Sequence, residues 1–357
     1  MTGSPRAQAD TVSEAEGPAP AGPASTRARV NWESVRRLTS GFSVLVSVLV
    51  LATYFSLRYT HSFATTENLL NMSRVAAILT VVAVGQTFAL VVGGFDLSVA
   101  ANMSFTGTVA ALTATHGHSL ALAVAVAIAC GTLIGLANGL LIAKAGVTPF
   151  VTTLGMLTLL DGLGNQISHG QSIYGLPESF GAIGRNDWGP VPSAVVIATI
   201  VVTVAWMILS HTRSGLYIFA LGGGREAARV SGVVVQRYEV LAFTLCGSFA
   251  GLAGVMLASR IDVGQANLAQ GYELSSIATA VIGGVAIGGG VARLRGVVSG
   301  VCLLVVLTTG LDIVGLNSFY QQMVTGVVLI CAVLVARIRG TFAPGTLIRR
   351  QSGKDAG

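Results

Sequence analysis

Ten segments of this chain are apolar enough, and long enough, to cross a membrane as helices. A helix needs about 20 residues to cross the hydrocarbon core, with about 17 as the lower limit. The ionisable residues within these segments are Asp161, Asp312 and, at an edge, Glu239. Because a charge at mid-bilayer costs at least about 2.5 kcal/mol, such scarcity is typical of spans. The candidate spans are 41–57, 75–92, 97–114, 120–143, 147–164, 190–210, 239–258, 274–291, 297–315 and 320–336.

The sequence therefore predicts an all-α polytopic membrane protein in which about ten helices cross the bilayer. Its composition agrees, since only 10% of the residues are charged against roughly 25% in soluble domains. Residues 1–40 are rich in Ala, Pro, Gly and Ser, which predicts a disordered tail. They lack the apolar core of a signal peptide. The predicted transmembrane domain is 41–340, followed by a C-terminal tail, 341–357.

The distribution of positive charge predicts the orientation. With ten spans and the N-terminus inside, 17 of the 21 Lys and Arg residues lie on the cytoplasmic side, as the positive-inside rule requires. Both termini are then cytoplasmic. The arginines are loop residues, so they do not imply binding to nucleic acid. The four basic residues outside are Arg58, Arg74, Arg185 and Arg260.

A polar stretch in the second half, residues 212–237, is the main candidate for contact with a cytoplasmic partner. Three glycines allow the backbone to turn, and R-E-A-A-R-V then forms about two helical turns with Arg225 and Arg229 on one face. A short helix outside the bilayer suits docking, although a solvated loop is the alternative. The candidate residues are Gly222, Gly223, Gly224, Arg225, Glu226, Ala227, Ala228, Arg229, Val230, Ser231 and Gly232.

Outside, the longest loop is 165–189. Its polar and aromatic residues suit contact with an external partner or a lid. For Trp188, a place in the aromatic belt at the membrane interface is the alternative.

Several polar or helix-breaking residues within the spans are candidates for a solute pathway. Asp96 either caps the helix that follows it or contacts solute, and Asp161 faces either a polar cavity or the interface. Neutral polar residues in spans usually form interhelical hydrogen bonds. Glycine pairs can break a helix, which is tolerated where the chain lines a cavity or is buried. The candidates are Asp96, Asn102, Thr153, Asp161, Gly283 and Gly284.

The sequence argues against several catalytic functions. It contains no G-x-x-x-x-G-K-[ST] run for binding ATP, no H-E-x-x-H pair and no G-x-S-x-G elbow. The four cysteines fall in apolar spans without C-x-x-C spacing, so we interpret them as small hydrophobic residues. No metal site is predicted, and an intramembrane enzyme is disfavoured.

A series of motifs in order gives the chain a strong resemblance, from about Asn68 to Gly340, to the inner-membrane permease subunit of bacterial ribose-type sugar ABC importers. The motifs are G-G-F-D-L-S (93–98), A-N-G-L-L-I (137–142), T-P-F-V-T-T-L-G (148–155), L-G-G-G-R-E-A-A-R-V-S-G (221–232), G-Y-E-L (271–274), A-V-I-G-G (280–284) and F-Y-Q-Q (319–322).

This resemblance implies a solute pathway at a dimer interface and a cytoplasmic ATPase, which carries ATP and Mg²⁺, docked on 221–232. It also implies an extracytoplasmic sugar-binding protein, a second permease chain and a location in the bacterial inner membrane. The chain departs from the family pattern at Ser275, Val285, Ala286 and Asp161, so the sugar is not carried over. The alternatives are a permease for branched-chain amino acids, nucleosides or a furanosyl signalling molecule, and a stand-alone secondary transporter.

Overall fold

The computed structural model describes residues 32–341 of the chain, and side chains for 44–334. Twelve α-helices make up most of this part. They are α1 (Trp32–Arg58), α2 (Thr66–Val91), α3 (Val99–Thr115), α4 (Leu120–Ala143), α5 (Pro149–Ser168), α6 (Ser193–His211), α7 (Arg213–Gly223), α8 (Arg225–Val230), α9 (Val235–Ile261), α10 (Tyr272–Ile282), α11 (Leu294–Ile313) and α12 (Ser318–Thr341). The 3₁₀ helix η1 (Glu178–Ala182) and the antiparallel pair β1 (Asp187–Trp188) and β2 (Val191–Pro192) join α5 to α6.

Five of the described helices, α2, α4, α6, α9 and α11, are long and apolar enough to cross a membrane by length and composition. Shorter apolar helices occupy 44–58, 272–282 and 318–334. Each predicted span coincides with a helix, but one is much shorter than expected. The helical, membrane-spanning class is thus confirmed, whereas a count of ten crossings stays a prediction.

Helix α1 begins at Trp32, within the predicted N-terminal tail. The rest of that tail, and residues 342–357 of the predicted C-terminal tail, lie outside the described residues.

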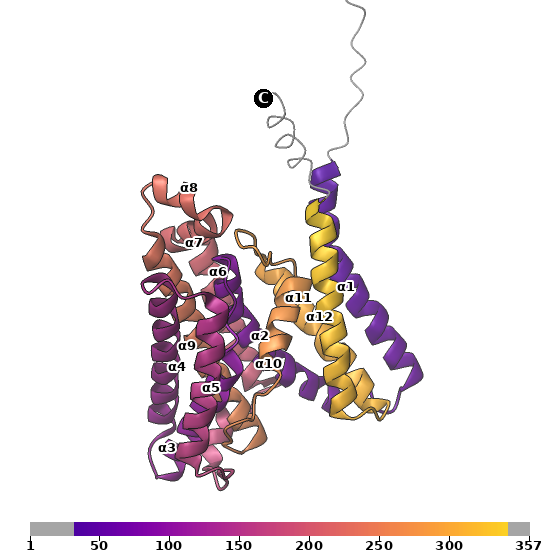
Figure 1. Ribbon diagram of the computed structural model, residues 1–357. Coiled ribbons are helices and arrows are strands. Elements are labelled where there is room, and N and C mark those ends of the chain that lie inside the picture. Colours follow the sequence, from indigo (N-terminus) through magenta and orange to yellow (C-terminus); the bar gives the residue numbers. More distant parts are fainter. Residues whose placement is uncertain (1–31, 342–357) are drawn as a thin grey trace, which may run out of the picture.

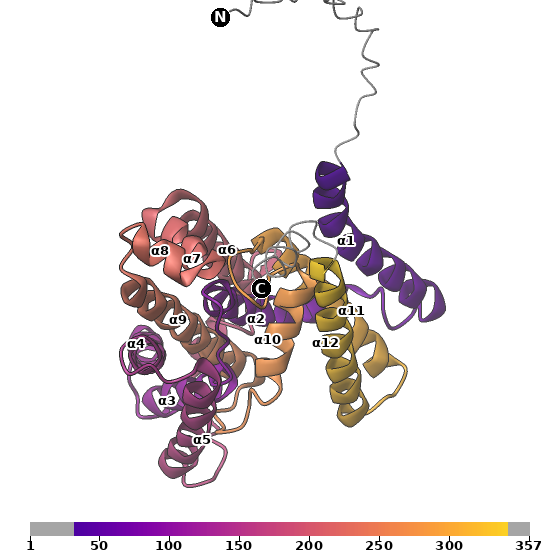
Figure 2. The same ribbon diagram turned by 45° about the horizontal axis from the view of Figure 1, so that its top comes forward.

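The helix α9 lies at the centre of the larger helix group and packs against α2, α3 and α4. Figure 2 shows it between α4 and α2. Glycines allow its close approach to α4, since a Cβ on Gly131 or Gly247 would meet the backbone of the other helix. Small residues thus let these two helices approach closely, as is common between helices in membranes.

A second group of helices, α1, α11 and α12, lies to one side of the molecule, with α2 and α10 between the two groups (Figure 1). Contacts of α1 with α11 and of α10 with both α11 and α12 hold this group together.

The chain breaks where the sequence predicted a continuous span over 274–291. Helix α10 ends at Ile282, and residues 283–293 are not helical. Gly290 N–H donates to the Val91 carbonyl at 2.9 Å, so this break meets the end of α2. Gly222 of α7 packs against both of these residues, and a Cβ there would overlap the Val91 oxygen. Glycine is needed at position 222 for this contact, not for the chain reversal that the sequence suggested.

Helices α7 and α8 lie together at one end of the molecule (Figure 1). Thr212 caps α7 by accepting a hydrogen bond from Gly215 N–H at 3.1 Å. The segment with η1, β1 and β2 lies at the other end of α6, because α6 leads directly from β2 to α7. The two predicted partner-facing segments are thus about one helix length apart.

Candidate functional site

A polar cavity of about 260 Å³ lies between α3, α5 and the start of α10. Two carboxylates, two carboxamides and one hydroxyl supply its polar lining, and the side chains from α3 are small. The lining residues are Ala100, Ala101, Ser104, Leu157, Asp161, Asn267, Gln270 and Glu273.

The carboxamides Asn267 and Gln270 reach this cavity because the chain after α9 turns back into the protein. In this non-helical segment, residues 262–271, Ala269 is completely buried, and its N–H donates to the Ser104 hydroxyl at 2.9 Å. Gly264 exchanges backbone hydrogen bonds of 2.8 and 3.0 Å with Ile173. Such pairing is what irregular backbone needs at membrane depth.

The start of α10 orients Glu273. Gly271 precedes this helix with φ of 94°, a conformation that favours glycine. Its N–H donates to the Glu273 carboxylate at 3.0 Å. The carboxylate is thus held in the first turn of α10, where the helix dipole favours negative charge.

Of the six predicted pathway residues, Asp161 lies on this cavity. Asn102 is buried and donates to the Gly247 carbonyl of α9 at 3.3 Å. Thr153 donates to the Pro149 carbonyl within its own helix at 2.9 Å. Gly283 packs against Gly296 of α11, whereas Gly284 adopts φ of 88° just after α10.

Asp96, the last of the six, is 1% exposed. Its Oδ1 accepts hydrogen bonds from the N–H and hydroxyl of Ser98, at 2.8 and 2.5 Å. Its Oδ2 accepts from the Asn138 carboxamide of α4 at 3.4 Å. Ser98 is the residue that precedes α3. Asp96 lies two residues before the N-cap Ser98, so it orders the turn into this helix without being the cap itself, and it joins the turn to α4.

The short helix predicted from R-E-A-A-R-V is present as α8, with the expected bounds. Its two arginines differ, however. Arg225 forms a bidentate pair with Glu239 of α9, with N–O distances of 2.8 and 2.6 Å, whereas Arg229 pairs with Glu226 at 2.8 Å on the exposed side. The Arg225 guanidinium is thus directed to α9, although 56% of its side chain stays exposed.

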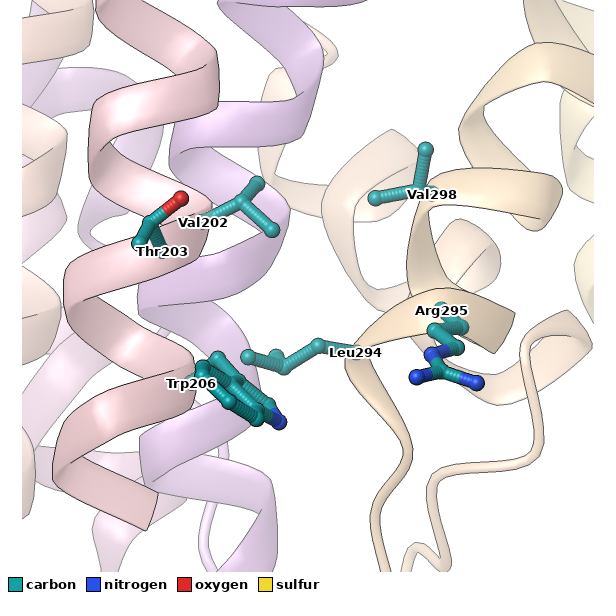
Figure 3. Close-up of a pocket in the computed structure, with 6 residues that line it drawn as sticks. All are labelled: Val202, Thr203, Trp206, Leu294, Arg295 and Val298. Atoms are coloured by element: carbon teal, nitrogen blue, oxygen red, sulfur yellow. The ribbon is translucent and has the colours of Figure 1, made fainter. Parts of the chain in front are cut away.

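A second, apolar cavity of about 490 Å³ lies between α6 and α11. In Figure 3, Trp206 and Val202 of α6 face Leu294 and Val298 of α11 across it. Thr203 and Arg295 complete its lining. The smaller cavity is the candidate solute site, because four of its eight lining residues are carboxylates or carboxamides.

A helical membrane protein with broken helices, buried irregular segments and a polar cavity has the features of a solute permease. The comparisons agree: the chain belongs to the family described as branched-chain amino acid transport system / permease component, which it matches over residues 68–333. Members are transport subunits, so this chain is not an enzyme.

The similar proteins include sugar permeases. The ribose import permease protein RbsC of Escherichia coli K12 is 38% identical over 295 residues, covering 82% of this chain and 92% of the relative. RbsC of Bacillus subtilis 168 is 33% identical, covering 87% and 95%. The L-arabinose transport system permease protein AraH of E. coli K12 is 33% identical, covering 84% and 90%. No solved structure matches significantly.

The sequence did not single out Asn267 and Gln270. They lie beyond the apolar run of α9, where a loop outside the membrane is the simplest interpretation. A signal was present in the small apolar residues that precede each of them, since Ala266 and Ala269 are both buried.

Proposed function

We propose that this chain is the permease subunit of an ATP-driven, binding-protein-dependent importer of a monosaccharide such as ribose, or of a similar polyhydroxylated solute. The ribose and L-arabinose permeases that it resembles support this class of solute. The polar cavity is the observation that carries the proposal.

The lining of this cavity suits a neutral, hydroxyl-rich solute. Carboxylates accept hydrogen bonds from hydroxyl groups, and carboxamides both donate and accept. Asp161, Glu273, Asn267 and Gln270 supply these groups. No Lys or Arg is among the lining residues of this described cavity, so the carboxylate of an amino acid would lack a countercharge there, whereas its ammonium group would suit the two lining carboxylates. The choice of a sugar over the branched-chain amino acids in the family description therefore rests on the ribose and L-arabinose relatives.

We assign one partner to each end of the molecule. ATP and Mg²⁺ are bound by a separate cytoplasmic ATPase, which docks on α8 and its neighbours, residues 222–232. An extracytoplasmic solute-binding protein delivers sugar at the opposite end, near residues 169–192. A second permease chain completes the transporter in the lipid of the bacterial inner membrane, with both termini cytoplasmic, as the bias in positive charge supports.

Uptake measurements test the cavity. We expect Glu273→Gln and Asp161→Asn each to lower uptake of labelled ribose by about 10-fold or more, because a hydrogen bond to a charged group contributes about 1.5–3 kcal/mol. The matched control is Asp312→Asn, which changes a carboxylate on α11 that interacts with Gln321. Normal ribose uptake by both cavity variants would refute the cavity as the pathway. Uptake blocked by leucine but not by pentoses would favour an amino acid permease.

The docking segment is tested by reversing its exposed charges. Glu226→Arg with Arg229→Glu keeps the pair within α8 but inverts the pattern that a partner meets. We expect normal membrane insertion, with loss of ATPase co-purification and of uptake together. Normal values of both would show that the segment is only a surface loop, and uptake without any ATPase would favour a secondary transporter.

A further inference from the structure

The bidentate contact between Arg225 and Glu239 is the ion pair that joins α8 to the rest of the described protein. The other ion pair of α8, Arg229–Glu226, lies within that helix. The apolar residue Ala228 of α8 is also buried, with 4% of its surface exposed. Next to this helix, Tyr217 of α7 packs against Tyr238 of α9, with ring centroids 4.9 Å apart. These contacts connect the α7–α8 segment to the first two turns of α9.

Burial makes this ion pair hard to break. The Glu239 side chain is 4% exposed, whereas that of Arg225 is 56% exposed. Removing Arg225 would leave a buried carboxylate without its countercharge, which is strongly unfavourable. A displacement of α8 therefore has to move Glu239 with it, because the two parallel N–H···O contacts also fix the relative orientation of the two groups.

The other end of α9 is connected to the cavity. Helix α9 has 27 residues and so spans about 40 Å. Directly after it comes the 262–271 segment, which carries Asn267 and Gln270 into the cavity lining. A shift of α9 along its axis would therefore change the position of two of the five polar side chains in the lining.

The same end of α9 also holds the external loop. The Ser259 hydroxyl donates to the Phe180 carbonyl and accepts from Gly184 N–H, at 2.5 and 2.9 Å. Arg185 forms an ion pair of 2.7 Å with Asp262, the residue after α9. A single helix thus connects α8, the solute cavity and the loop opposite α8.

We propose that Arg225 and Glu239 are positioning residues that transmit movement of α8 to α9, and through α9 to the Asn267–Gln270 cavity wall. This inference rests on the proposed function, because it takes α8 as the contact with the ATPase. In this proposal the ion pair serves coupling, and it takes part neither in docking of the ATPase nor in contact with solute. Loss of the ion pair should therefore let ATP hydrolysis continue with less solute uptake.

The experiment uses the full-length permease with its ATPase and binding protein in proteoliposomes. The measured quantity is the amount of labelled ribose imported per ATP hydrolysed. Glu239→Gln removes the charge at the buried end, and Arg225→Lys keeps the charge but loses the bidentate contact. We expect this ratio to fall at least threefold in Glu239→Gln and less in Arg225→Lys, with normal ATPase co-purification in both. The control Arg237→Gln removes an exposed cation two residues from Glu239 and should keep the wild-type ratio.

The outcomes separate the two proposals. A wild-type permease that binds no ATPase contradicts the proposed function itself. Wild-type uptake with unchanged ratios in both variants overturns the coupling inference alone, as does an equal fall in the Arg237→Gln control. If Glu239→Gln does not yield folded protein, Arg225→Lys decides the result, because it leaves a cation beside the buried carboxylate. A wild-type ratio in that variant then refutes the need for the bidentate contact.

Discussion

The glycine contact between α4 and α9 allows a quantitative test of the packing. In Gly247→Ala, the added Cβ would lie 2.6 Å from the Gly135 Cα and 2.7 Å from its nitrogen. Ordinary contacts of a Cβ begin at about 3.4 Å, so the two backbones must separate by about 0.8 Å at the Gly135 Cα and by more at the Gly131 carbonyl oxygen, which lies nearest to the added Cβ. Rotation of a side chain cannot relieve the overlap because the opposing atoms belong to the backbone. Overpacking of this kind costs about 1–3 kcal/mol.

The assay is the free energy of unfolding of the purified protein in mixed detergent micelles, measured by titration with a denaturing detergent. The matched control is Gly162→Ala in α5, where an added Cβ meets no atom within 4 Å. Because alanine is the better helix former, this control should be neutral or more stable by up to about 1 kcal/mol. Equal stability changes in the two variants would refute the packing argument.

Two further predictions concern the turn before α3 and the orientation. Asp96→Ala leaves the Ser98 donors without their acceptor and should destabilise the protein by about 1–3 kcal/mol, whereas Asp96→Asn should retain most stability and uptake because its amide oxygen still accepts from Ser98. Equal losses in the two variants at normal protein levels would show that the charge itself matters. For orientation, a cysteine at the exposed Gly223 should react with an impermeant thiol reagent only from the cytoplasmic side, and one at His169 only from outside. Labelling of Gly223 from outside would overturn the topology.

Local patterns predicted much of the fold. Apart from α7, the positions of the longer helices followed from apolar runs, and α8 followed from six residues, since both features depend on short-range sequence. Helix α7 was missed because Thr212 and the polar residues near it dominate the stretch, although L-Y-I-F-A-L within it is apolar. The break after Ile282 was signalled by its glycines, but a continuous span over 274–291 satisfies the same hydropathy.

The candidate site was harder to predict because it depends on contacts between distant residues. Asp161 was identified as an acid within a span, but its cavity partners come from α10 and from the segment after α9. Similarly, Arg225 and Glu239 are each ordinary edge residues in sequence. Their pairing requires α8 to fold back on α9, and the sequence pattern carries no information about the angle between these two helices.

The hydrogen bond from Gly290 N–H to the Val91 carbonyl ties together two interruptions that are about 200 residues apart in the chain. Within a bilayer, water is scarce and a separated donor and acceptor would both stay unpaired, at a cost of several kcal/mol. The end of α2 and the chain between α10 and α11 therefore keep this hydrogen bond only if they move together. Any opening of the inner face of this permease should then occur around this junction, at its boundaries with neighbouring helices, and leave the junction closed.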